Sequence, residues 1–178
     1  MVRSAMPPSS LYSILMGQDP GFRARQNLMA MCLGMCNAGE AAEVVVLGFI
    51  LAEMDDDLDF AEKSLLSSAV FFGMLCGGLL WGSLSDINGR HPTLLLALLL
   101  AAGAGFASSF VPDVYTLIAM RAIAGIGIGG SIPTLFALGK EIFPSARSGQ
   151  LLSLVASFWM MGALWVAGAG YIMLGYEG

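Results

Sequence analysis

The sequence predicts an all-helical membrane protein with five transmembrane helices. Apolar residues make up 57% of the 178 residues and charged residues only 12%, against about 25% charged residues in a typical soluble protein. A soluble globule needs more polar groups than this to cover its surface. The apolar residues also gather in continuous stretches of about twenty residues, the length that crosses a hydrocarbon core of about 30 Å. Strands of a membrane β-barrel would instead alternate over about ten residues.

Each predicted helix rests on one apolar stretch. Residues 94–100 contain six leucines and one alanine. Pro92 suits the first turn of the same helix, where a missing N–H leaves no hydrogen bond unmade. The connections are short, so neighbouring helices should run antiparallel. The predicted spans cover residues 28–52, 64–84, 93–111, 114–138 and 151–173.

The chain before the first span reads as a leader. It carries no secretory signal and contains the prolines Pro7, Pro8 and Pro20. We expect a soluble cytoplasmic leader over residues 1–26 and a transmembrane domain over residues 27–178. The number of spans is odd and no polar tail follows the last one, so we expect the chain to be a fragment of a longer protein.

Basic residues lie on one side of the predicted membrane. The other side holds Lys63 and six acidic residues between Glu53 and Glu62. Because loops rich in Lys and Arg stay in the cytoplasm, the N-terminus is predicted to be cytoplasmic. Whether the membrane is the plasma membrane or a vesicle membrane stays open. The basic residues of the first side are Arg3, Arg23, Arg25, Arg90, Lys140 and Arg147.

The residue pattern argues against several function classes. No basic patch is interleaved with aromatic residues, so no nucleic-acid partner is expected. The cysteines Cys32, Cys36 and Cys76 lie in apolar runs, without a C-x-x-C pair or a nearby histidine, so neither a metal site nor a disulfide is expected. The sequence shows no nucleophile with a base and no phosphate loop, so we predict neither an enzyme nor a cofactor.

The acidic connection after the first span imitates a calcium-binding loop. Asp55, Asp57 and Asp59 have the spacing of its first ligands, but Phe60 and Leu66 stand where the loop requires Gly and Glu. A solvated acidic loop is therefore expected.

Small residues mark where helices can approach closely. The second span contains Gly73 and Gly77, and the fourth contains Gly125 and Gly129, each pair with the G-x-x-x-G spacing of packed membrane helices. Residues 125–130 also match the dinucleotide pattern G-x-G-x-x-G. That pattern needs a preceding strand and a later acidic residue, and here it lies inside an apolar span. We therefore predict helix packing.

Three charged residues lie within the predicted spans. A charge at this depth costs at least about 2.5–3.5 kcal/mol, so it normally faces a partner or a wet cavity. Glu40 and Glu43 are three residues apart and share one helix face. At 1.5 Å per residue they lie about 18 and 22 Å from the cytoplasmic side. Arg121 lies about 20 Å from the same side, so all three occupy one level.

We expect Arg121 to pair with Glu40 or Glu43 across a central cavity. A change in the distance between the cation and the acids could then bind or release a proton, as proton-coupled transport requires. The alternative is a static buried ion pair that only orients two helices.

The connection between the second and third spans carries a motif. It follows the pattern G-x-x-x-D-x-x-G-R, which resembles the signature of the major facilitator superfamily. In the fourth span, glycines occupy every second position from residue 125 to residue 129, starting four residues after Arg121. This arrangement is similar to the fourth-helix pattern of that superfamily. The motif residues in the connection are Gly82, Asp86, Gly89 and Arg90.

A third motif follows in the order expected for that superfamily. The segment from Glu141 to Arg147 is similar to a loop of its sugar-porter and organic-ion branches. By this resemblance, Asp86, Arg90, Glu141 and Arg147 form a cytoplasmic ion network that locks one conformational state. The alternative is a set of ordinary solvated loop charges, whose exposed pairs are worth only about 0–1 kcal/mol.

A narrower resemblance is to the synaptic-vesicle-glycoprotein-2-like branch. It rests on the acid pair Glu40 and Glu43 in the first helix and on the run from Trp81 to Asp86 in the second. The likeness extends over most of residues 37–165. Ile87 and His91 depart from it, because basic residues are common at these two positions.

The resemblance implies the N-terminal half of a twelve-helix transporter, in which this chain supplies five helices of a six-helix half. It implies transport of a small organic solute, an organic ion or a sugar, by alternating access and with H⁺ as the coupling ion. The implied partners are the solute, the proton, the lipid bilayer and the remaining transporter helices. Two alternatives stay open: a membrane protein of the same fold that binds or regulates without transporting, and a uniporter that uses no proton.

Overall fold

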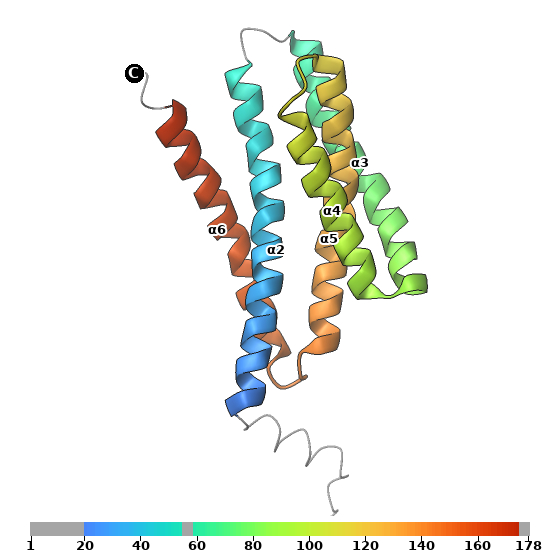
Figure 1. The fold of residues 1–178 in the computed structure, drawn as a ribbon, viewed down its shortest axis with the longest axis vertical. Coiled ribbons are helices and arrows are strands. Elements are labelled where there is room, and N and C mark those ends of the chain that lie inside the picture. Colours follow the sequence, from blue (N-terminus) through green and yellow to red (C-terminus); the bar gives the residue numbers. More distant parts are fainter. Residues whose placement is uncertain (1–19, 55–58, 175–178) are drawn as a thin grey trace, which may run out of the picture.

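The computed structural model describes residues 20–54 and 59–174, and all its regular elements are helices (Figure 1). Five helices in this part of the chain are long and apolar enough to cross a membrane. The predicted all-helical fold with five spans is therefore confirmed. The helices are α2 (Pro20–Glu53), α3 (Phe60–Asn88), α4 (Arg90–Ser108), α5 (Val114–Ile142) and α6 (Ser148–Leu174).

Most helices extend beyond the predicted apolar spans, because backbone hydrogen bonding continues after the apolar residues end. Helix α2 begins at Pro20, so residues 20–26 of the predicted leader are helical. A proline is well tolerated at the first helical position, where its missing N–H has no partner. Residues 1–19 of that leader and the acidic residues 55–57 lie outside the described part of the chain.

The third span ends earlier than expected. Helix α4 stops at Ser108, so the predicted end at residue 111 is wrong. Pro112 lies four residues after this end. The residue before a proline is disfavoured in helical conformation, so the helix is not expected to continue to residue 111. Helix α5 then starts after Asp113, whose carboxylate accepts a hydrogen bond from the Thr116 N–H at 3.0 Å. This contact satisfies one of the free N–H groups at the start of the helix.

The helices form two groups. Helix α5 packs against both α3 and α4, and α2 packs mainly against α6. Figure 1 shows α6 crossing beside α2, apart from α3, α4 and α5. Contacts between the two groups are few, and they include the buried cluster in which Leu33 of α2 meets Leu94 and Leu135.

Close backbone contact joins α3 to α5. A Cβ added at Gly73 would fall on the Ala122 carbonyl oxygen, and one added at Gly77 would lie 2.8 Å from the Ile126 Cα. From the other side, Gly125 faces the Val70 backbone and Gly129 faces the Met74 backbone. The structure thus places all four predicted packing glycines in one seam, where missing side chains let the helices gain dispersion contact.

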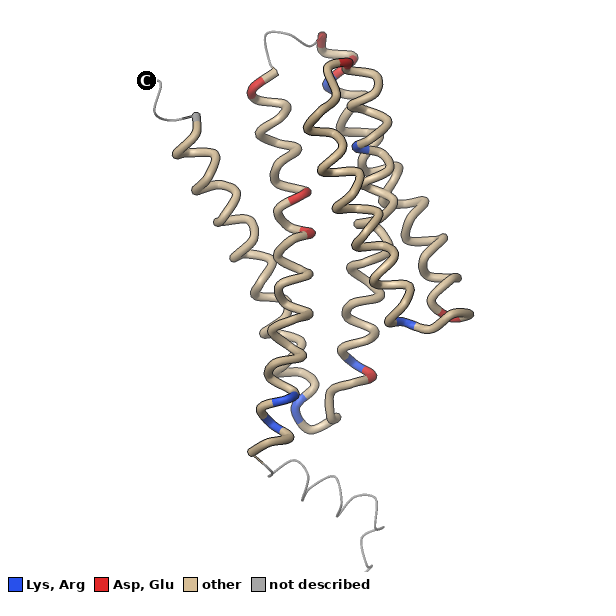
Figure 2. The backbone as a smooth tube through the Cα atoms, viewed as in Figure 1, with Lys and Arg blue, Asp and Glu red and all other residues tan. Residues whose placement is uncertain are grey.

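Most charged residues lie at the two ends of the bundle, and a few lie between the ends (Figure 2). Large side chains such as Phe72, Leu79 and Trp165 are exposed, as expected where lipid is the solvent. We call the end with Arg23, Arg25, Arg90, Lys140 and Arg147 the basic end. We call the end with Glu53, Asp59, Glu62 and Asp113 the acidic end.

Candidate functional site

The central feature of the site is an ion pair between two helices. Arg121 Nη1 of α5 lies 3.1 Å from Glu43 Oε2 of α2. The side chain of Arg121 is 8% exposed and that of Glu43 is 28% exposed. Of the two partners that the sequence allowed for Arg121, the structure selects Glu43. The pair bridges the two helix groups where they have few other contacts.

Glu40 lies one turn from Glu43 but does not pair with Arg121. It is 3% exposed, its carboxyl lies beside the Ser131 hydroxyl of α5, and its Oε2 has no hydrogen-bond partner. The Nε of Arg121 is also buried without a partner. Since buried polar groups are normally hydrogen-bonded, the site offers one free acceptor and one free donor.

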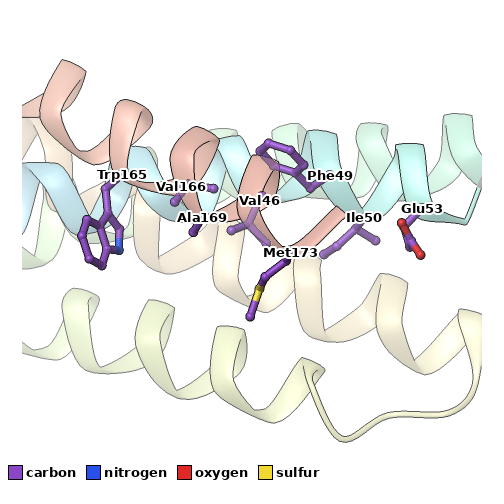
Figure 3. A pocket seen from close by; sticks show the side chains of 9 residues that line it. Val46, Phe49, Ile50, Glu53, Trp165, Val166, Ala169 and Met173 are labelled. Carbon is purple, nitrogen blue, oxygen red and sulfur yellow. The ribbon is translucent and has the colours of Figure 1, made fainter. Parts of the chain in front are cut away.

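The two acids line a pocket of about 230 Å³ between α2 and α4. Larger grooves of about 370 and 380 Å³ lie between α2 and α6 and are almost wholly apolar. Figure 3 shows the first of these, in which Glu53 at one end is the only charged residue among the described residues that line it. The smaller pocket is lined by Met35, Cys36, Gly39, Glu40, Glu43, Leu98, Ala101 and Ala102.

A second cluster of charges lies at the basic end. Arg90 Nε is 3.1 Å from Glu141 Oε1, and Arg90 Nη2 is 3.4 Å from Asp86 Oδ1. Arg90 Nη1 also donates to the Ser85 hydroxyl at 3.1 Å. Gly89 directs the chain into α4 with a φ of +91°, in a region that is essentially restricted to glycine. These contacts connect α3, α4 and α5.

Arg147 does not join this cluster. It donates to Gln26 Oε1 and Asn27 Oδ1 of α2, each at 3.3 Å. The expected network of four residues is therefore wrong for Arg147. The physical reason is that α2 begins at Pro20, so its first turns pass beside the connection between α5 and α6. Gly82, the first motif residue, has no atom within 4 Å of an added Cβ and so marks no close approach.

Two polar contacts inside the bundle were not predicted from the sequence. Asn37 is 2% exposed and donates from Nδ2 to the Val155 carbonyl at 3.1 Å, which joins α2 to α6. Trp81 Nε1 donates to the Ile126 carbonyl at 3.0 Å, which joins α3 to α5. Asn37 precedes Glu40 by three residues and shares its helix face, and that spacing was a signal for it.

Comparison with known proteins identifies the family. The model described as Major Facilitator Superfamily matches residues 28–178. Synaptic vesicle glycoprotein 2A of Rattus norvegicus and that of Homo sapiens are 36% identical over 148 residues, 82% of this chain and 20% of each relative. Synaptic vesicle glycoprotein 2C of Mus musculus is 32% identical over 163 residues, 90% of this chain and 22% of the relative.

The chain thus spans about a fifth of the length of these curated relatives. The matches agree with the motif order in the loops and with five helices that can cross a membrane. The chain is a multi-pass membrane protein, and it belongs to the major facilitator superfamily, in the branch that resembles the synaptic vesicle glycoproteins 2.

Proposed function

We propose that the chain is part of a transporter that moves a small organic solute across a membrane by alternating access, coupled to a proton. The observation that carries this proposal is the buried pair of Arg121 and Glu43 with Glu40 beside it. Ionisable groups inside membrane spans are costly and commonly serve substrate or ion pathways.

The two helix groups give such a site a way to change. The Arg121–Glu43 pair connects α2 to α5, and contacts between these helices are few. A shift of α2 and α6 relative to the other helices would therefore change the distance between the cation and both acids. A carboxyl group that gains or loses a nearby cation is suited to release or bind a proton.

Glu40 is the proposed proton carrier. Replacing it by glutamine keeps the size of the side chain but removes the group that titrates. Uptake driven by a pH gradient should then fall by at least about tenfold, a change that corresponds to 1.4 kcal/mol. The measurement is solute accumulation in sealed vesicles that contain the complete protein, with and without an imposed pH gradient.

Glu53→Gln is the matched control, because Glu53 lies on the same helix but is exposed at the acidic end. It should leave uptake unchanged. Uptake that keeps its response to the pH gradient in Glu40→Gln contradicts the proton role. Solute flux in the wild-type protein that never responds to a pH gradient indicates a uniporter. No flux in a screen of organic ions and sugars indicates a protein that binds or regulates.

We place the basic end in the cytoplasm, because loops rich in Lys and Arg are retained there. In this orientation the pairs of Arg90 with Asp86 and Glu141 lie at the cytoplasmic face. We assign them the role of stabilising one of the two access states. Arg90 connects α3 and α4 to α5, so this role requires that these three helices also rearrange at the basic end when α2 and α6 shift.

Removing Arg90 should shift the balance between the two access states. Both of its ion pairs are partly exposed, and such pairs contribute about 0–1 kcal/mol each. Arg90→Ala should therefore change the ratio of inward-open to outward-open protein by roughly three- to tenfold. Thiol labelling of single cysteines placed at each end measures this ratio.

Lys140→Ala removes a cation from the same end without touching the Arg90 pairs. It should leave the ratio unchanged. Equal effects of the two substitutions would show that the general charge of the basic end acts, and not the Arg90 contacts.

A further inference from the structure

We propose that Gly105 of α4 is a positioning residue that holds the Glu43 carboxylate against Arg121. The importance of this contact for transport rests on the function proposed above. The contact itself rests on geometry alone. Helix α4 supplies no charged group to the site, yet it determines where the carboxylate can lie.

The carboxylate of Glu43 occupies the space that a side chain at residue 105 would fill. A Cβ added at Gly105 would lie 2.8 Å from both Glu43 Cδ and Glu43 Oε2, and it would overlap Oε1. The same Oε2 accepts the hydrogen bond from Arg121 Nη1 at 3.1 Å. The carboxylate is thus held between the bare backbone of α4 and the guanidinium of α5.

Neither of the usual reasons for a glycine applies at this position. Among the described residues, the only glycine with a positive φ is Gly89, so Gly105 has ordinary helical backbone. Nor is it a helix-packing glycine like Gly127, whose added Cβ would meet the Ala97 and Ala101 backbone. All three atoms nearest to an added Cβ at Gly105 belong to the end of one side chain, that of Glu43.

The surroundings tell us where a displaced carboxylate would go. Glu43 also lines the pocket of about 230 Å³ between α2 and α4. A methyl group at residue 105 would turn the flexible Glu43 side chain into this pocket, away from Arg121. Gly105→Ala should therefore break the ion pair and leave the helix packing intact.

The test compares two glycines of the same helix in the complete protein. An added Cβ at Gly103 has no atom within 4 Å, so Gly103→Ala is the matched control. Gly105→Ala should lower the melting temperature in detergent and slow proton-driven uptake by at least about tenfold. Gly103→Ala should change neither. Equal effects of the two variants would overturn the proposal.

A double-mutant cycle separates positioning from general packing. In a Glu43→Ala background the added methyl group meets no carboxylate, so Gly105→Ala should lower the melting temperature no further. A fall as large as in the wild-type background would show that the methyl group disturbs the helix itself, and the positioning role would be wrong.

Melting temperature tests the positioning role, and the response of uptake to a pH gradient tests the proposed function. If residues 105 and 43 are coupled in melting temperature but uptake does not respond to the pH gradient, the positioning role is supported and proton transport is contradicted. If residues 105 and 43 show no coupling in melting temperature but uptake depends on the pH gradient, the positioning role is contradicted and the proposal of proton transport is kept.

Discussion

Replacing Arg121 with alanine should abolish proton-driven uptake and lower the free energy of unfolding by about 3 kcal/mol. Removing one partner of a buried ion pair costs about 3–5 kcal/mol, because the other charge is left uncompensated. The lower end applies, since the side chain of Glu43 is 28% exposed. Uptake into sealed vesicles measures the first effect, and unfolding of the detergent-solubilised protein measures the second.

The control for this prediction removes both charges. Arg121→Ala combined with Glu43→Ala leaves neither member of the pair uncompensated, so much of the stability should return while uptake stays lost. A double variant that is no more stable than Arg121→Ala would show that the lost stability does not come from the unpaired Glu43 carboxylate. Normal proton-driven uptake in Arg121→Ala would contradict the functional role of the pair.

Replacing Gly77 with alanine should have a comparably large effect, this time on folding. The new Cβ would lie 2.7 and 2.8 Å from the carbonyl carbon and Cα of Ile126. These are backbone atoms of a helix, and they cannot turn aside as a side chain can. Overpacking commonly costs 1–3 kcal/mol, and we expect about 3 kcal/mol. Unfolding in detergent and the yield of folded protein report the loss.

Gly78 offers a neighbouring control on the same helix. An added Cβ there would have its nearest contact at 3.4 Å, to the Gly129 carbonyl oxygen, which is at the edge of ordinary van der Waals contact. Gly78→Ala should therefore cost much less than Gly77→Ala. Equal costs would mean that helix propensity or lipid contact, and not the seam between α3 and α5, decides the outcome.

The sequence predicted the number and type of elements because lipid imposes a simple rule on apolar stretches. A stretch of about twenty apolar residues has one stable form in a bilayer, the helix. Helix ends depend on local contacts and were less predictable. Hydropathy placed the end of the third helix at residue 111, whereas the backbone constraint of Pro112 favours an end before it.

The site was predictable in its charges and not in its pairings. The cost of a charge in lipid pointed to Arg121, Glu40 and Glu43 without any structure. Which acid pairs with the cation depends on helix rotation and on the space at Gly105, and neither is encoded locally. Arg147 shows the same limit, because its partners on α2 are 120 and 121 residues away in the chain.

The pairing of α2 with α6 has a consequence for biosynthesis. Asn37 and Val155, which join these helices, are 118 residues apart. A ribosome that adds roughly 5–20 residues per second needs roughly 6–24 s to make that stretch. During this interval α2, with its polar Asn37 and acidic Glu40, has not yet met the helix against which it mainly packs. Until α6 is made, the Asn37 amide lacks the carbonyl group to which it donates in the folded bundle.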